Sequence, residues 1–234
     1  HLVATGGFLD DTGYDRIYWM YSKRWPGFYF AQQSPKAGQL LVFDERTTYA
    51  VKYFYRRHQW SPLLIPAEQG YLLFADDNDN EPSFLKKGAK PGLLEWLPKD
   101  TVKDSHRRGG QGVEKGTGYV RQKPETWQSL VPLRVRAMVL AQAADSGQTG
   151  QLLFTAGLPD VLDPVDPLAS FEGRKGALLN VYSAQDGSLL KSAPMASVPA
   201  FDGMIAAHNR LYIVTEDAKL ICMAGDRHRA VALH

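Results

Sequence analysis

The sequence predicts an all-β protein of antiparallel strands, and two observations support this. The segment from Gly176 to Gly225 consists of short alternating apolar runs separated by turn residues at near-regular spacing. Alternation with a period of two, bounded by Asp-Gly and Asn-containing turns, is typical of strands joined in hairpins. Similar runs before residue 76 are rich in aromatic and β-branched residues, which favour strands.

Composition favours one globular domain, and we predict a single domain over residues 1–234. Hydrophobic residues make up 44% of the chain, which excludes a disordered protein. No apolar run reaches the roughly 18 residues that a spanning helix needs, so we predict no membrane span. Basic and acidic residues nearly balance, at 27 and 25, so charge gives no basis for nucleic-acid binding.

Three regions follow one another along the chain. Before residue 76 the predicted strands are DRIYWMYS, GFYFAQ, GQLLVFDE, TTYAVKYF and GYLLFA. Residues 76–126 are polar and rich in Gly, Lys, Asp and Pro, so we predict a long insertion within the domain, of the kind that usually carries function.

The third region resumes the strand pattern. In RVRAMVLAQ, Arg134 and Arg136 alternate with Val135, Ala137 and Val139, which predicts a strand with one buried face. QLLFTAG follows, and then a link rich in Pro and Asp, for which we predict one helical turn over residues 167–172. The remaining predicted strands are GALLNVYS, SLLKSAPM, GMIAAH, LYIVTE and LICMAG.

Units of about 40 residues with four short strands are typical of β-propeller blades. About a dozen to fifteen candidate strands would make three to four antiparallel, four-stranded blades, fewer than most closed propellers use. We therefore predict a propeller-like fold that is either part of a ring or completed by strands of the insertion. A β-sandwich is the structural alternative.

Residues 176–225 resemble the quinoprotein-like (PQQ-like) β-propeller repeat, and LYIVTEDAKLICMAG is the hairpin closest to its pattern. GGFLDDTGYDRIYWMYSKR, RVRAMVLA and DPLASFEGRKGALL resemble the C-terminal portion of large secreted bacterial proteins that carry such repeats. The resemblance covers about half of the chain. It implies a propeller and a secreted or periplasmic location, and it leaves the function open because propellers host unrelated activities.

Two departures argue against a quinone cofactor. Quinone-dependent dehydrogenases of this family carry tryptophan docking motifs, and many carry a pair of adjacent cysteines. Here SLLKSAPM follows Asp186-Gly187 without a tryptophan, and Cys222 is the chain's single cysteine. We expect Cys222, within an apolar strand, to be a small buried hydrophobe. The resemblance therefore implies a scaffold rather than a redox site.

Carboxylates and aromatic side chains cluster near the N-terminus in the way that sugar-binding sites combine them. The predicted ligand-binding residues are Asp11, Arg16, Tyr18, Trp19 and Trp25. A glycoside hydrolase would instead use two carboxylates from Asp10, Asp11 and Asp15. The same residues could also cap turns at the edge of a blade, and the sequence leaves these alternatives open.

A second cluster predicts a cation site. Asp76, Asn78 and Asn80 place oxygen ligands at alternate positions, as calcium requires, although the glycine of an EF-hand loop is missing. The alternative is a solvated turn after a strand. Calcium is the one metal or cofactor that we retain as a candidate for this scaffold.

A terminal histidine raises one further hypothesis. The amine and imidazole of His1 could chelate copper together with a second histidine, as in copper-dependent polysaccharide oxidases. The candidates for that second ligand are His58, His106, His208, His228 and His234, and none has a diagnostic spacing. We prefer the interpretation that His1 is a fragment boundary.

We therefore predict a non-catalytic propeller scaffold or binding module that engages a protein or a glycan through its rim loops. The alternative is a glycan-active enzyme, either a carboxylate hydrolase or an N-terminal-histidine copper oxidase.

Overall fold

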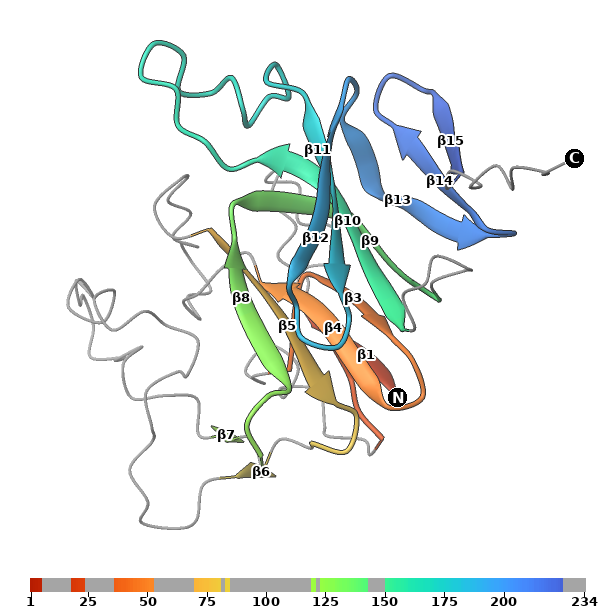
Figure 1. The fold of residues 1–234 in the computed structure, drawn as a ribbon. Helices are drawn as coiled ribbons and strands as arrows, with labels where there is room; N and C mark the ends of the chain where they lie inside the picture. Colours follow the sequence, from red (N-terminus) through yellow and green to blue (C-terminus); the bar gives the residue numbers. More distant parts are fainter. Residues whose placement is uncertain are drawn as a thin grey trace, which may run out of the picture.

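The computed structural model describes residues 1–5, 18–23, 36–52, 70–80, 83–84, 119–120, 123–142 and 150–224. Within these ranges the protein is all-β: fifteen strands form only antiparallel pairs, and no residue is helical (Figure 1). In the same ranges no helical stretch has the length and hydrophobicity that crossing a bilayer requires.

Three sheets make up most of the structure. The N-terminal sheet contains, in spatial order, β3 (Leu40–Phe43), β4 (Thr47–Lys52), β5 (Tyr71–Asp77) and β8 (Trp127–Val131). The central sheet contains β9 (Leu133–Gln142), β10 (Gln151–Pro159), β11 (Ala177–Ser183) and β12 (Leu189–Met195). The C-terminal sheet contains β13 (Pro199–Ala207), β14 (Arg210–Thr215) and β15 (Leu220–Ala224).

Two small pairs accompany these sheets. β1 (Leu2–Thr5) pairs with β2 (Tyr18–Tyr21), and β6 (Ser83–Phe84) pairs with β7 (Tyr119–Val120). A single bridge between Trp19 and Gly38 connects β2 to the chain just before β3. The segment between β6 and β7, residues 85–118, falls in the predicted insertion and lies outside the described residues.

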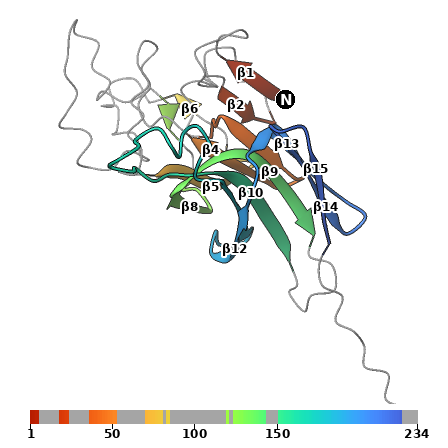
Figure 2. The same cartoon turned by 90° about the horizontal axis from the view of Figure 1, so that it is seen from above.

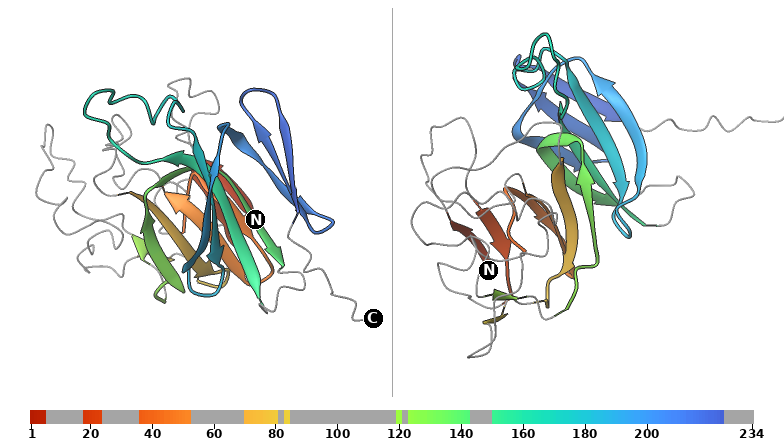
Figure 3. Two further views of the ribbon diagram at one scale, coloured as in Figure 1. Left: turned by 45° about the horizontal axis from the view of Figure 1, so that its top comes forward. Right: turned by 90° about the vertical axis from the view of Figure 1, so that its left-hand side faces the viewer.

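The three sheets pack face to face in series (Figures 2 and 3). One core lies between the N-terminal and central sheets and contains Val51, Leu73, Leu133 and Leu153. A second core lies between the central and C-terminal sheets, around Ala156, Leu179, Met204 and Ile213. Both faces of the central sheet are therefore covered.

The chain runs through the sheets in a repeating way. The last strand of the N-terminal sheet, β8, leads through Pro132 directly into the first strand of the central sheet, β9. Residues 196–198 similarly connect β12 to β13. The first strands of the sheets approach each other most closely, because β9 lies against both β3 and β13.

The prediction that β9 buries a single face is wrong, because a β-bulge reverses its side chains. Val135 pairs with Gly157 and Ala137 with Ala156, so Arg136 is an extra residue on β9. Before the bulge Val135 faces the first core, whereas Ala137 beyond it faces the second. Gly157 is required here, since a Cβ atom would lie 2.0 Å from the carbonyl oxygen of Arg134.

Strand β8, which the sequence did not predict, supplies a tryptophan contact between sheets. The Trp127 indole packs on the β11–β12 turn, where a Cβ atom on Gly187 would lie 2.5 Å from the ring. Its Nε1 donates a hydrogen bond of 2.9 Å to the carbonyl oxygen of Ala184. A tryptophan therefore does meet the Asp186-Gly187 turn, but it comes from the preceding sheet and not from the sequence that follows the turn.

The C-terminal hairpins agree closely with the predicted strands. β13 and β14 are joined by His208 and Asn209, whose φ angles of 51° and 58° are typical of a type I′ turn. The Thr215 amide donates to the Lys219 carbonyl oxygen across the next turn, and the Ala218 amide, at a residue with a φ of 60°, donates to the Thr215 carbonyl oxygen.

Candidate functional site

The residues predicted to bind a cation are buried. Asp76, Asn78 and Asn80 all have 0% exposure, so these three residues are not solvated, although the chain does turn at residues 78–79 directly after β5 and Asp77 and Asp79 are exposed. The Asn78 Oδ1 accepts a hydrogen bond of 2.7 Å from the Thr48 hydroxyl, and its Nδ2 donates to the carbonyl oxygen of Asp44. These residues join the end of β5 to the β3–β4 turn.

Asn80 connects the same segment to the chain that enters β8. Its Nδ2 donates to the Asp76 carboxylate at 2.7 Å and to the Lys123 carbonyl oxygen at 2.8 Å, and its Oδ1 accepts from the Lys123 amide at 2.9 Å. The side-chain oxygens that calcium would need therefore already accept hydrogen bonds from the protein.

A lysine side chain supplies positive charge inside this segment. Lys36 is fully buried, and its Nζ donates to the carbonyl oxygens of Asp77 at 2.8 Å and Asn78 at 3.3 Å. Carbonyl oxygens are also the ligands that a bound cation would take. The ammonium group of Lys36 thus occupies a position beside oxygens that a metal ion would compete for.

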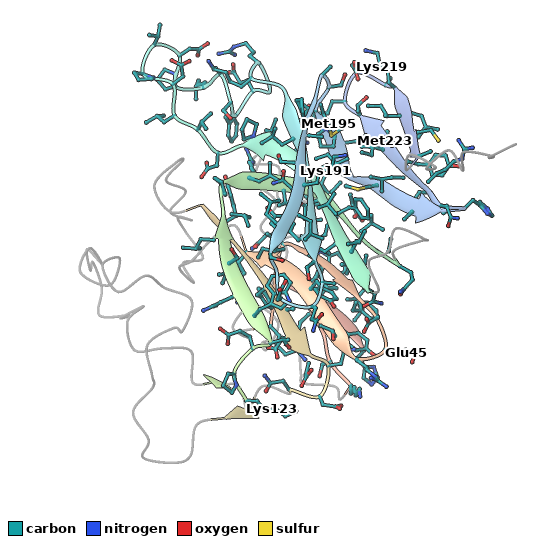
Figure 4. All side chains as sticks on the ribbon, in the orientation of Figure 1. Glu45, Lys123, Lys191, Met195, Lys219 and Met223 are labelled. Atoms are coloured by element: carbon teal, nitrogen blue, oxygen red, sulfur yellow. The ribbon has the colours of Figure 1, made fainter. Side chains whose placement is uncertain are left out.

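Lysine residues also pair with the exposed carboxylates of this segment. Lys23 contacts Asp79 at 2.6 Å, and Lys123, at the lower end of the molecule in Figure 4, contacts Asp77 at 3.4 Å. The hydrogen bond from Lys23 lowers the pKa of Asp79. Three lysines, Lys23, Lys36 and Lys123, therefore accompany the three acids of the 76–80 segment.

No group of three or more His, Cys, Asp or Glu side chains is placed to hold a metal ion within the described ranges. The predicted calcium site would use one carboxylate, Asp76, and the amide oxygens of Asn78 and Asn80, and it stays a prediction. The structure does show that the buried polar side chains of this segment form hydrogen bonds that connect the end of β5, the β3–β4 turn and the chain before β8.

The predicted ligand-binding residues are only partly covered by the structure. Asp11, Arg16 and Trp25 lie outside the described residues, as do Asp10 and Asp15. Tyr18 and Trp19 both lie in β2, and Trp19 is partly buried, with its amide donating to the Gly38 carbonyl oxygen at 2.7 Å. The sugar-binding and hydrolase hypotheses therefore stay predictions.

The copper hypothesis also stays a prediction. The His1 amine donates to the Ser22 carbonyl oxygen, and His208 lies in the β13–β14 turn. The other four candidate histidines lie outside the described residues.

The expectation that Cys222 is buried is wrong. Its side chain is exposed on β15, and Arg210 lies beside it, with Nη1 3.8 Å from Sγ. Cys222 pairs with Tyr212 and lies on the face opposite its neighbour Ile221, which packs against the second core, so Cys222 is on the outer face of the C-terminal sheet.

A different region presents a surface that the sequence analysis did not single out. Residues 160–176, between β10 and β11, form a long loop that projects beyond the sheets at the upper left of Figure 1. We call it the 160–176 loop. Val165 is 94% exposed, and the other exposed large apolar side chains of the loop are Val161, Leu162, Leu168 and Phe171.

Asp163 holds the first half of this loop in one conformation. Its Oδ1 accepts hydrogen bonds from the amides of Val165 at 2.9 Å and Asp166 at 3.2 Å, and its Oδ2 lies 2.5 Å from Lys175 Nζ. The hydrogen bond from Lys175, followed by those from the two amides, lowers the pKa of Asp163 from 3.8 to about 2. The ion pair joins the two ends of the loop.

Turns and a second ion pair hold the other half. The Glu172 amide donates to the Leu168 carbonyl oxygen at 2.9 Å, but residues 167–172, where one helical turn was expected, form a series of turns and none of them is helical. Arg174 binds both carboxylate oxygens of Asp166 at 2.6 Å.

The base of the loop is attached to the central sheet. The Ser170 hydroxyl donates to the carbonyl oxygen of Pro159, at the end of β10. The Arg134 guanidinium of β9 lies 4.3 Å from the centre of the Phe171 ring, a cation–π contact. These contacts fix the backbone while Leu162, Val165 and Leu168 remain in solvent.

An ordered loop with exposed aliphatic side chains suits docking of another apolar surface. Two features of the sequence indicate such a loop. One is the rigid Asp-Pro-Val-Asp-Pro stretch at residues 163–167, and the other is that apolar residues lie between the successive acidic residues of the loop. The sequence alone nevertheless predicts only a link here, because the ion pairs that order the loop join residues far apart within it.

No family model, curated protein or solved structure matches this chain.

Proposed function

We propose that this chain is a non-catalytic scaffold of the quinoprotein-like β-propeller type that binds a partner protein through its 160–176 loop. The observation that carries the proposal is the combination of fixed backbone and exposed aliphatic side chains in that loop. By the family resemblance, the location proposed is secreted or periplasmic.

The order of the sheets supports the propeller part of the proposal. Each sheet is an antiparallel meander, the last strand of one leads into the first strand of the next, and the first strands lie closest together. Propeller blades are four-stranded sheets arranged around a central axis, and these features are typical of them. The Trp127 contact with the Gly187 turn adds a repeat-to-repeat link of the kind that the resembled family uses.

The loop's position supports its role in binding. It leaves the central sheet at the end of β10 and returns at β11, so it extends a sheet whose two faces are already packed (Figure 1). Because the ion pairs order it before any partner arrives, binding would cost little conformational entropy. Loops held on a rigid scaffold are common sites of recognition.

The chemistry of the exposed side chains favours a protein over a glycan. Leu162, Val165 and Leu168 offer aliphatic carbon without hydrogen-bonding groups, whereas sugars require polar partners and aromatic faces. Phe171 is the loop's one aromatic residue, and its ring is engaged by Arg134. A partner with an apolar groove or patch is therefore the best match.

The test is a quantitative affinity capture from an extract of the source organism. Three immobilised proteins are compared: the wild type, the double variant V165D/L168D, and the control L190D, which places the same charge on an exposed leucine of β12. We expect one protein to be enriched by the wild type and by L190D but lost from V165D/L168D, because a buried unpaired carboxylate is costly in an apolar contact.

Two results would overturn the proposal. Equal recovery of every enriched protein by the loop variant would remove the loop from recognition. Binding of the wild type and the loop variant to the same immobilised glycan would replace protein by glycan as the ligand.

A further inference from the structure

We propose that one water molecule is bound inside the protein between the N-terminal and central sheets, where it joins Thr155 of β10 to Asn180 and Tyr182 of β11. The site is separate from the 160–176 loop and does not depend on the proposed function. The observation behind it is a buried hydroxyl group that forms no hydrogen bond within the described part of the chain.

Thr155 supplies that hydroxyl group. Its side chain is fully buried, and its Oγ1 has no hydrogen-bond partner among the described residues. A buried hydroxyl without a partner costs free energy, and in folded proteins such groups are usually satisfied by another protein group or by an ordered water. Thr155 therefore needs a partner that the described residues do not provide.

The strand register places Thr155 beside two further polar side chains. Thr155 is the strand partner of Asn180, so the two side chains lie on the same face of the central sheet. Tyr182, two residues further along β11, lies on that face as well, and its hydroxyl is 3.1 Å from Asn180 Nδ2. Tyr182 belongs to the first core, and so does Met138, which pairs with Thr155 on β9. This face is therefore the one that packs on the N-terminal sheet.

Asn180 and Tyr182 both have a hydrogen left to donate. The Asn180 Oδ1 accepts from the Ser192 hydroxyl at 2.7 Å, and its Nδ2 donates one of its two hydrogens to the Tyr182 hydroxyl. Burial raises the pKa of Tyr182, so the phenol keeps its own proton. Among the described residues that proton and the second Asn180 amide hydrogen have no acceptor.

A water molecule matches these groups in number and in charge. It has two lone pairs and two hydrogens, so it can accept from Tyr182 and Asn180 while it donates to the Thr155 Oγ1. Buried waters typically make about three hydrogen bonds to groups of this kind. Met138, Thr155, Asn180 and Ser192 form a row across the central sheet without a charged side chain, so a neutral ligand fits better than an ion.

Crystal structures of the wild type, T155V and T155S test the site directly. Valine has nearly the shape of threonine but lacks the hydroxyl, whereas serine keeps it and is the matched control. In the wild type and T155S we expect a water peak at about 2.7–3.2 Å from the hydroxyl oxygen of residue 155 and from Asn180 Nδ2 or the Tyr182 oxygen. An empty site in the wild type would overturn the proposal, as would a peak of unchanged occupancy in T155V.

Thermal melting gives an independent readout, because the sign of the change differs between a satisfied and an unsatisfied hydroxyl. If a water binds Thr155, T155V removes one of the water's partners and should lower the melting temperature by about 2–4 °C. If the hydroxyl is unpaired, valine removes a buried polar group that costs free energy, and the melting temperature should rise. A melting temperature of T155V equal to or above that of the wild type would therefore contradict the bound water.

A double variant tests whether one water serves both strands. Tyr182→Phe removes a second hydroxyl that binds the same water, so the combined loss in T155V/Y182F should be smaller than the sum of the two single losses. The control is T155V/T48V, because the Thr48 hydroxyl donates to Asn78 in the N-terminal sheet and its loss should add to that of T155V. Full additivity of T155V and Y182F would overturn the shared site.

Discussion

The 76–80 segment and the 160–176 loop reverse the usual relation between polarity and exposure. The first consists entirely of Asp and Asn, yet Asp76, Asn78 and Asn80 are fully buried. The second carries Leu162, Val165 and Leu168, yet these side chains are in solvent. Hydrogen bonds and lysine contacts order both segments. Composition alone therefore does not show which segment holds the fold together and which exposes side chains for binding.

The difference lies in what each network holds in place. In the 76–80 segment the polar side chains themselves join β5, the β3–β4 turn and the chain before β8. In the 160–176 loop the charged side chains of Asp163, Asp166, Arg174 and Lys175 pair with one another and leave the apolar side chains exposed. Substitutions should therefore affect stability in the first region and binding in the second.

The largest effect is expected for Asn80→Asp. The change removes the amide that donates to Asp76 and to the Lys123 carbonyl oxygen, and it places a second buried carboxylate beside Asp76. We expect a loss of roughly 3 kcal/mol in the free energy of unfolding, measured by urea denaturation at neutral pH.

Adding calcium to that variant sharpens the comparison. If calcium restores the stability of N80D and also raises that of the wild type, the segment is a cation site, as the sequence analysis predicted. A loss well below about 1 kcal/mol without calcium would contradict a structural role for Asn80.

A smaller loss is expected for Lys36→Met. Methionine keeps much of the side chain's volume but removes the ammonium that donates to the Asp77 and Asn78 carbonyl oxygens. The cost should be about 2 kcal/mol, because buried carbonyl oxygens lose a charged donor. The control is Lys175→Met, which removes a lysine from the exposed loop and should change the thermal melting temperature little.

Acid should loosen the 160–176 loop through Asp163. Its pKa is about 2 in the folded protein, below the ordinary value of 3.8, so the carboxylate stabilises the loop above about pH 4 and loses this effect as the pH falls through 2. The amide resonances of Val165 and Asp166 should follow that titration in NMR spectra. Lys175→Met should move the midpoint upward, and an unchanged midpoint would contradict the ion pair as the main cause.

The smallest effect on stability is expected for Val165→Ser. The side chain is almost fully exposed, so the free energy of unfolding should change by no more than about 0.5 kcal/mol. Recovery of the partner protein should nevertheless fall. A large loss of stability would show that Val165 packs within the molecule and is not a presented side chain.

Local patterns predicted the part of the fold that local interactions determine. The strands from β11 to β15 follow alternation and turn residues such as Gly187 and Asn209, which act within a few residues. β8 was missed because its partner β5 lies on the other side of the predicted insertion. The prediction that β9 buries one face is wrong because of the β-bulge at Arg136. This bulge depends on the close approach of Gly157 on β10 to the Arg134 carbonyl oxygen, which the sequence of β9 does not indicate.

The burial or exposure of the candidate site residues depends even more on residues that are distant in the sequence. Nothing near Asp76 in the sequence indicates that Lys36 and Lys123 approach its neighbours, and this contact decides that the segment is buried. The exposure of Cys222 was missed for the opposite reason: an apolar strand predicts burial, and no described sheet covers its outer face.

Hydrogen–deuterium exchange of the isolated protein at neutral pH tests the central claim most directly, because that claim is an apolar loop ordered before it binds. The amides of Glu172 and Arg174 donate to the carbonyl oxygens of Leu168 and Ala169. We expect these amides to exchange many times more slowly than unstructured peptide, although the side chains around them are in solvent. Exchange at the rate of unstructured peptide throughout residues 160–176 would contradict a preformed binding surface.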